Sequence, residues 1–95
     1  MPEPDNRPTV KLDGDYDLSR REELRDALYA LKDADAVAID LQNVSYMDSA
    51  GLGVLINFNK RFVQQGGPPI RLLNVQPRLR RVVGITGLDK VFDID

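Results

Sequence analysis

The sequence predicts an α/β domain in which strands and helices alternate along the chain. Three segments carry apolar residues at helical spacing, short apolar runs lie between them, and glycine or proline separates the two kinds of segment. The resulting order is strand, helix, strand, helix, strand, helix, strand. This alternation favours right-handed crossovers, so we expect a mixed, mostly parallel sheet of about four strands, covered by about three to four helices.

The beginning of the chain predicts an arm followed by a strand. Residues 1–8 hold three prolines with acidic and polar neighbours, a composition with little apolar surface to bury. We therefore expect a flexible arm there and one folded domain over residues 9–95. The first strand is expected over residues 9–12, and Gly14 permits the turn that follows it.

A capping pattern and an apolar face predict the first helix. Ser19 followed by Glu22 matches the capping box, in which each side chain bonds a backbone N–H that the first turn leaves free. Apolar residues then recur at i, i+3, i+4 and i+7, as Leu24, Ala27, Leu28 and Leu31. This spacing places them on one side of a helix, against the core.

The middle of the chain predicts a covered strand and a second helix. Residues 36–41 are apolar on both faces except at Asp40, which is typical of a strand covered by helices. A helix that begins at Ala50 or Gly51 is expected next, and the QQGGPP segment at residues 64–69 stops it.

The last third of the chain predicts a strand, a third helix and an edge strand. The strand is expected over residues 70–75 and the edge strand over residues 91–94. Pro77 suits the first turn of the helix between them, and Gly84 and Gly87 are expected to end it.

Composition excludes several classes of function. The chain has 95 residues, no cysteine and no histidine, so disulfides, thiol nucleophiles, Cys/His zinc sites and histidine-based triads are excluded. The net charge of -2 gives no long-range attraction to nucleic acid or to an anionic membrane. The first residues lack the apolar segment of a signal peptide. We therefore expect one cytoplasmic domain with no direct membrane contact.

The stretch YMDSAGLGVL, residues 46–55, holds the candidate functional residues. Glycine inside a helix costs about 1 kcal/mol relative to alanine, so Gly51 and Gly53 in a first turn need a reason. One interpretation is that Ser49 only caps the helix, as its N-cap or close to it, which leaves both glycines unexplained. The preceding strand should place Ser49 at an end of the sheet, so we expect it to be exposed.

Two further interpretations of this stretch fit the residues poorly. A nucleophile elbow needs glycine on both sides of the serine and a base, whereas Asp48 and Ala50 flank Ser49 and the chain has no histidine. A nucleotide-binding loop needs a third glycine or a lysine, and neither follows Gly51 and Gly53 at the required spacing. We therefore expect a protein that is not an enzyme and takes no small-molecule substrate.

The remaining interpretation is a docking surface that phosphorylation switches off. Without Cβ atoms at the glycines, another protein, such as a kinase, could approach the helix and reach Ser49. A phosphate would add a charge of about -1.5 to -2 at a helix N-terminus, which tolerates an anion. A docked partner would meet that charge beside Asp48, in an apolar patch of Tyr46, Met47 and Leu52. Each of these three could equally be a core residue.

Three segments carry a resemblance to a known family. LDGDYD, residues 12–17, has the pattern L-x-G-x-x-D; VAIDLQNVSYMDSAGLGVL, residues 37–55, has a D-S-x-G-L-G element after an apolar strand; and TGLDKVF, residues 86–92, follows. Together these segments resemble the STAS domains and, within them, the bacterial anti-sigma factor antagonists. The resemblance covers about residues 9–92.

This resemblance implies a specific partner and a specific site. Ser49 would be phosphorylated by the anti-sigma factor, an ATP-dependent serine kinase, and a cognate phosphatase would reset it. Asp48 matches the acidic residue before the serine, and Asp17 matches a loop aspartate beside it. Many relatives have a second hydroxyl where this chain has Ala50, so Ser49 is the single acceptor. The expected partner-binding residues are Asp17, Tyr46, Met47, Asp48, Ser49, Ala50, Gly51, Leu52 and Gly53. ATP and Mg²⁺ would belong to the kinase, so this chain would need no cofactor and no metal.

Other classes of function stay open at this point. A STAS subunit of a transporter or of a larger signalling complex would share the fold without being phosphorylated. Nucleic-acid binding through Arg78, Arg80 and Arg81 is disfavoured, because no aromatic side chains accompany them and a solvated helix face explains them.

Overall fold

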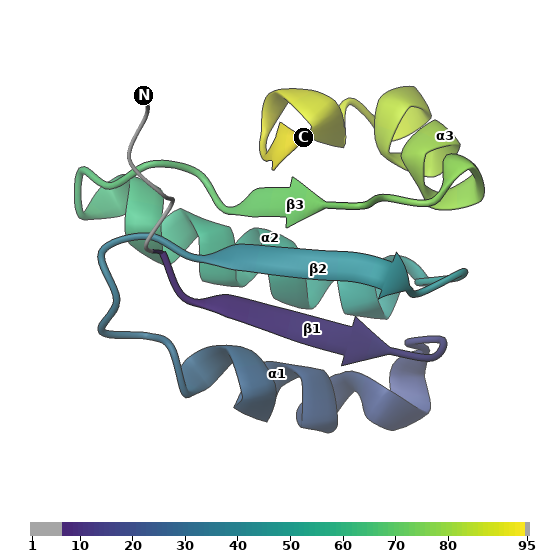
Figure 1. The fold of residues 1–95 in the computed structure, drawn as a ribbon, viewed down its shortest axis with the longest axis horizontal. Helices are drawn as coiled ribbons and strands as arrows, with labels where there is room; N and C mark the ends of the chain where they lie inside the picture. The colour runs from purple at the N-terminus through teal and green to yellow at the C-terminus, as the bar shows by residue number, and fades with distance from the viewer. Residues whose placement is uncertain (1–6, 95) are drawn as a thin grey trace, which may run out of the picture.

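A computed structural model describes residues 7–94. Its four strands form one sheet in the order β1-β2-β3-β4, and the longest helix, α2, runs along one face of it (Figure 1). The elements in chain order are β1 (Thr9–Asp13), η1 (Leu18–Arg20), α1 (Arg21–Tyr29), β2 (Ala38–Asn43), α2 (Ser49–Gln64), β3 (Arg71–Leu73), α3 (Pro77–Thr86), η2 (Leu88–Lys90) and β4 (Asp93–Ile94), where η marks a 3-10 helix.

The sheet is parallel in all three of its strand pairs. Val10 pairs with Ile39, Ile39 with Leu72, and Leu72 with Ile94, so one row of apolar residues crosses the sheet. The predicted α/β fold with about four strands and three helices is confirmed. The antiparallel pair that a mixed sheet would contain does not occur within residues 7–94.

One apolar core lies between the sheet and the helices. The helix α1 packs against α2, and both contribute residues from their apolar faces to this core. Its largest fully buried side chains are Leu24, Leu28, Ile39, Leu41, Leu55, Ile70, Leu72, Val37, Val44 and Val83. The apolar positions that predicted α1 therefore face inward, whereas Val63 of α2 and Val82 of α3, which were expected on the apolar faces, are exposed.

The start of α1 differs from the prediction. The capping box at Ser19 and Glu22 is wrong, because the chain first forms η1, whose N-cap is Asp17. The Asp17 carboxylate accepts from the backbone N–H and the hydroxyl of Ser19, at 2.9 and 2.5 Å. The helix α1 then begins at Arg21, with no side-chain cap.

The C-terminal elements are shorter than predicted at their ends. The strand expected over residues 70–75 is regular only over Arg71–Leu73, and Asn74 adopts a left-handed conformation with φ of 55° directly after it. Gly87 ends α3 with φ of 78°, whereas Gly84 lies inside that helix.

The arm expected over residues 1–8 falls largely on residues 1–6, outside the described residues. Pro8 is described, and its carbonyl accepts from Ala38 N of β2 at 2.9 Å.

Candidate functional site

Two loops meet at the end of the sheet where β1 and β2 finish. The segment after β1 and the segment after β2 form an isolated parallel bridge between Tyr16 and Met47. Tyr16 N donates to Tyr46 O and Asp48 N donates to Tyr16 O, both at 3.1 Å. Because parallel strands end on the same side of a sheet, Asp17 and the start of α2 are carried to one surface.

Asp48, and not Ser49, is the N-cap of α2. The Asp48 carboxylate accepts from Ala50 N at 3.0 Å and from Gly51 N at 3.1 Å. Ser49 is the first residue of the helix itself, one position later than an N-cap. The expectation that Ser49 caps α2 is therefore corrected by one residue. The Ser49 hydroxyl therefore does not cap the helix, and it makes no hydrogen bond within residues 7–94.

Ser49 is exposed at this surface, as predicted, and acidic residues lie on both segments that meet there. Asp48 precedes it and is half-buried, while Asp17 lies on the neighbouring loop and is exposed. The hydrogen bond from the Ser19 hydroxyl, together with that from the Ser19 N–H, holds the pKa of Asp17 below its ordinary value. Asp17 therefore stays a carboxylate well below neutral pH.

The two glycines of α2 have different surroundings. A Cβ on Gly51 would lie 2.6 Å from Met47 Cγ and 3.3 Å from Tyr16 O, so this glycine allows close packing inside the protein. A Cβ on Gly53 would have no neighbouring atom within 4 Å. The idea that a missing Cβ admits another protein is thus wrong for Gly51, which is buried, and remains available only for Gly53.

The expected apolar patch is mostly interior. Tyr46 is 48% exposed, but Met47 is only 3% exposed and Leu52 only 9%. The interpretation of Met47 and Leu52 as core residues is therefore correct, and the interpretation as surface contacts is wrong for both. The accessible part of the stretch consists of Tyr46 and Ser49, with Asp48, Ala50 and Gly53 half-buried.

Arg20 organises this surface and was missed by the sequence analysis. Its Nη1 donates to Asp13 O at 2.9 Å and to Asp15 O at 3.1 Å, and its guanidinium lies 4.1 Å from the centre of the Tyr16 ring. Its Nε forms an ion pair with Glu23 at 2.7 Å. Arg20 therefore closes the loop that carries Asp17. The two backbone carbonyls that it binds lie five and seven residues earlier, a spacing that no helix or strand pattern indicates.

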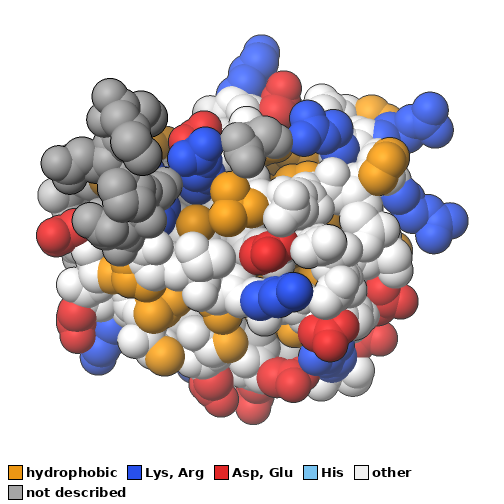
Figure 2. Space-filling model, viewed as in Figure 1, with side chains coloured by type: hydrophobic (Ala, Val, Ile, Leu, Met, Phe, Trp, Pro, Cys, Tyr) orange, Lys and Arg blue, Asp and Glu red, His pale blue; other side chains and the backbone are white. Residues whose placement is uncertain are grey.

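Within residues 7–94 there is neither a metal-ligand cluster nor a membrane-spanning helix. No group of three or more acidic side chains within residues 7–94 is placed to hold a metal ion. No helix in that range has both the length and the apolar character needed to cross a membrane. The arginines of α3 are exposed, and basic side chains project outward over that helix in Figure 2, as expected of a solvated face.

The fold and the site together define a small α/β binding module that presents one free hydroxyl at the start of a helix. The chain belongs to the STAS domain family. The family model described as "Mlab, STAS domain" matches residues 1–93, which is nearly the whole sequence.

Relatives with known names indicate which kind of STAS protein this chain is similar to. The chain is 41% identical over 86 residues to the anti-sigma-B factor antagonist of Bacillus subtilis (strain 168), covering 90% of this chain and 78% of that protein. It is 36% identical over 83 residues to the protein of the same name from Listeria monocytogenes, covering 85% and 72%. An anti-sigma factor antagonist from Mycobacterium paratuberculosis has a similar crystal structure, with a TM-score of 0.80 and 27% identity over 97% of this chain and 80% of that one.

Proposed function

We propose that this chain is an anti-sigma factor antagonist that phosphorylation of Ser49 inactivates. In its unmodified form it binds an anti-sigma factor that is also a serine kinase, and the sigma factor held by that kinase is released. The kinase brings ATP and Mg²⁺, a cognate phosphatase resets the antagonist, and this chain catalyses no reaction. The observation that carries the proposal is the position of Ser49, an exposed hydroxyl at the first residue of α2 with no hydrogen bond within residues 7–94.

The geometry explains how one phosphate would end binding without unfolding the protein. A phosphoserine carries about -1.5 to -2 charges, and an exposed helix N-terminus tolerates an anion. However, Asp48 already occupies the N–H groups of Ala50 and Gly51. The new dianion would therefore remain largely unpaired on the surface, beside two carboxylates. Covering an unpaired charge with a partner costs several kcal/mol, enough to lose binding.

The test uses the purified chain, its candidate kinase and ATP. Mass spectrometry should locate one phosphate on Ser49, and Ser49→Ala should abolish it while kinase binding persists. Ser49→Asp should weaken binding measured by calorimetry by about tenfold or more, a loss of about 1.4 kcal/mol. Ser45→Ala is the matched control, because Ser45 is also exposed and its hydroxyl donates to Asp15 at 2.7 Å.

Two results would overturn the proposal. Phosphate on another residue would contradict the site, and equal affinity of Ser49→Asp and the unmodified chain would contradict the switch. A chain that binds no such kinase and takes no phosphate would instead be a STAS interaction module of a transporter or a larger complex.

A further inference from the structure

A small hollow lies between α1 and α2, away from Ser49. Its volume is about 150 Å³. Its lining combines apolar side chains with two arginines and an amide; the lining residues are Arg21, Arg25, Leu28, Tyr29, Val54, Asn57 and Phe58. Pockets for small-molecule ligands usually measure about 300 to 1,000 Å³, so this hollow accommodates a single side chain better than a whole ligand.

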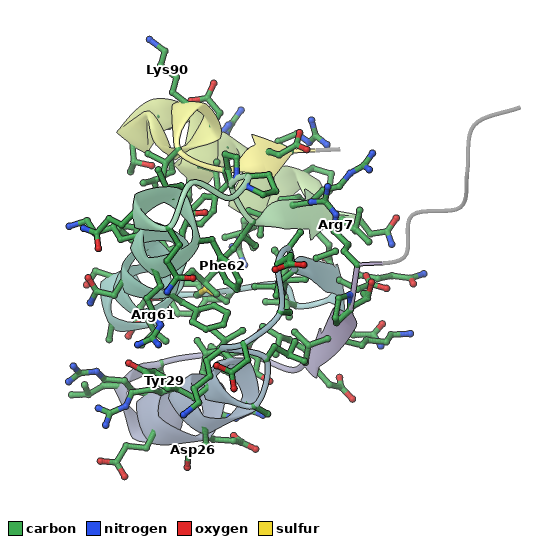
Figure 3. The ribbon with its side chains drawn as sticks, turned by 90° about the vertical axis from the view of Figure 1, so that its left-hand side faces the viewer. Arg7, Asp26, Tyr29, Arg61, Phe62 and Lys90 are labelled. Atoms are coloured by element: carbon green, nitrogen blue, oxygen red, sulfur yellow. The ribbon has the colours of Figure 1, made fainter. Side chains whose placement is uncertain are left out.

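Two guanidinium groups lie near the Tyr29 ring, which lines this hollow. The Arg61 guanidinium is 5.2 Å from the centre of the Tyr29 ring and that of Arg25 is 6.0 Å from it. Figure 3 shows Arg61 extending from α2 toward Tyr29 on α1. The ring also packs against Phe58, with centroids 6.1 Å apart, and remains 43% exposed. An exposed tyrosine beside arginines is a composition typical of the energetic centres of protein interfaces.

The positive charges around this hollow have no acidic partners. Within residues 7–94, Arg21, Arg25 and Arg61 form no ion pair, and the buried Nε of Arg61 has no hydrogen-bond partner. Asp26 lies on the side of α1 away from Arg61 (Figure 3). Three arginines that line this hollow or face its Tyr29 ring therefore form no ion pair within the described residues, although the net charge of the chain is -2. Guanidinium groups form strong charge-assisted hydrogen bonds with carboxylates, so arginines without an ion pair here can pair with carboxylates of another molecule.

We propose that this hollow receives an acidic segment of the partner protein. One apolar side chain of that segment packs in the hollow beside the exposed Tyr29 ring, and neighbouring carboxylates pair with Arg25 and Arg61. The inference deepens the proposed function and rests on it for the identity of the partner, the anti-sigma factor kinase. The chemistry of the bound segment rests only on the hollow itself.

The position of the hollow fits one interface that also covers Ser49. Val54 and Asn57 lie five and eight residues after Ser49 on α2, which places them roughly 8 to 12 Å farther along the helix axis. A standard interface covers about 800 Å² on each partner, enough to include both places. A second hollow shares Arg21 and Arg25 and adds Leu18, which is 68% exposed, so the surface continues toward η1.

The first experiment probes the hollow without any kinase. The isotope-labelled full chain is titrated with the peptide Ac-EDFEE-amide, the neutral peptide Ac-QNFQQ-amide and inorganic phosphate, and followed by NMR. We expect saturable shifts at Tyr29, at the Asn57 side chain and at the Arg25 and Arg61 Nε groups with the acidic peptide only. Equal shifts with phosphate would indicate a simple anion site and overturn the proposal, as would no shift with the acidic peptide.

The second experiment measures binding to the kinase. Arg25→Glu should weaken binding by about tenfold or more, with the loss decreasing at high salt. Arg81→Glu, an exposed reversal on α3, makes the same change in net charge and should have little effect. If the unmodified chain binds the kinase and Arg25→Glu binds equally well, the hollow is not a contact. If the unmodified chain binds no kinase, the proposed function fails, and the peptide titration still decides the chemistry of the hollow.

Discussion

Substituting each glycine of α2 with alanine should change stability in opposite directions. The Gly51→Ala methyl would lie 2.6 Å from Met47 Cγ, inside a core where Met47 is 3% exposed. Tyr16 O, 3.3 Å from the same point, is backbone held in the bridge to Met47, so neither neighbour moves away freely. Overpacking of this kind costs about 1 to 3 kcal/mol and exceeds the helix-propensity gain of up to about 1 kcal/mol. Gly53→Ala gains the propensity without a contact.

We therefore expect the free energies of unfolding of these two variants to differ by about 2 kcal/mol, or roughly 10 °C in melting temperature for a domain of this size. Urea unfolding followed by circular dichroism measures this difference. A double variant with Met47→Ala tests the cause, because removing the Met47 side chain should make Gly51→Ala less harmful. The reasoning is refuted if Gly51→Ala alone is as stable as the unmodified chain, or if Gly53→Ala is the worse of the two.

The remaining predictions concern two polar groups that connect secondary-structure elements. Two hydrogen bonds hold the pKa of Asp40 below its usual 3.8. The backbone N–H of Gln42 donates the one with the larger effect, and the side-chain amide of Asn74 donates the other. The folded pKa is lowered, so this stabilisation is complete above the unfolded value and is lost as the pH falls through the folded pKa. Asp40→Asn should thus be less stable in urea at pH 7 and nearly equal to the unmodified chain at about pH 2; an equal deficit at both would contradict this. Asn59 is buried, accepts from Ile70 N at 2.7 Å and donates to a carbonyl just before β4 at 3.2 Å. Asn59→Ala should lower the free energy of unfolding by about 2 to 3 kcal/mol, because it leaves the fully buried Ile70 N without an acceptor. The control Asn57→Ala, at an exposed position, should change it by less than about 0.5 kcal/mol. Similar losses for both variants would refute the role of Asn59.

The elements could be predicted from the sequence because their signals are local. Apolar spacing within one segment, as at Leu24 and Leu28, determines which side of a helix is buried. The ends of β3 depend on distant atoms instead. Ile70 N donates to the Asn59 side chain and not to a neighbouring strand, so the strand begins one residue later than expected.

The prediction that Ser49 lies exposed at an end of the sheet is confirmed, but the roles predicted for it and for its neighbours at the start of α2 are not. Asp48 and Ser49 are both good N-cap residues, and their order alone cannot fix where the helix begins. The structure fixes it through Asp48 N, which donates to Tyr16 O while Asp48 keeps the extended backbone that an N-cap requires. The role of Gly51 likewise depends on Met47, which is held in place by its bridge to Tyr16, a residue distant in sequence. Such contacts leave no periodic signal.

The loop that Arg20 closes would affect how fast a partner binds at the proposed site. Ordering a flexible segment on binding costs about 1 to 2 kcal/mol for each residue that is fixed. Here the Arg20 guanidinium already donates to two backbone carbonyls of the segment, and the bridge to Met47 holds Tyr16 in place as well. A partner that docked beside Asp17, as proposed, would find the segment in place before the encounter. Association can then proceed without waiting for a rearrangement, and the lifetime of the complex is left to the contacts themselves.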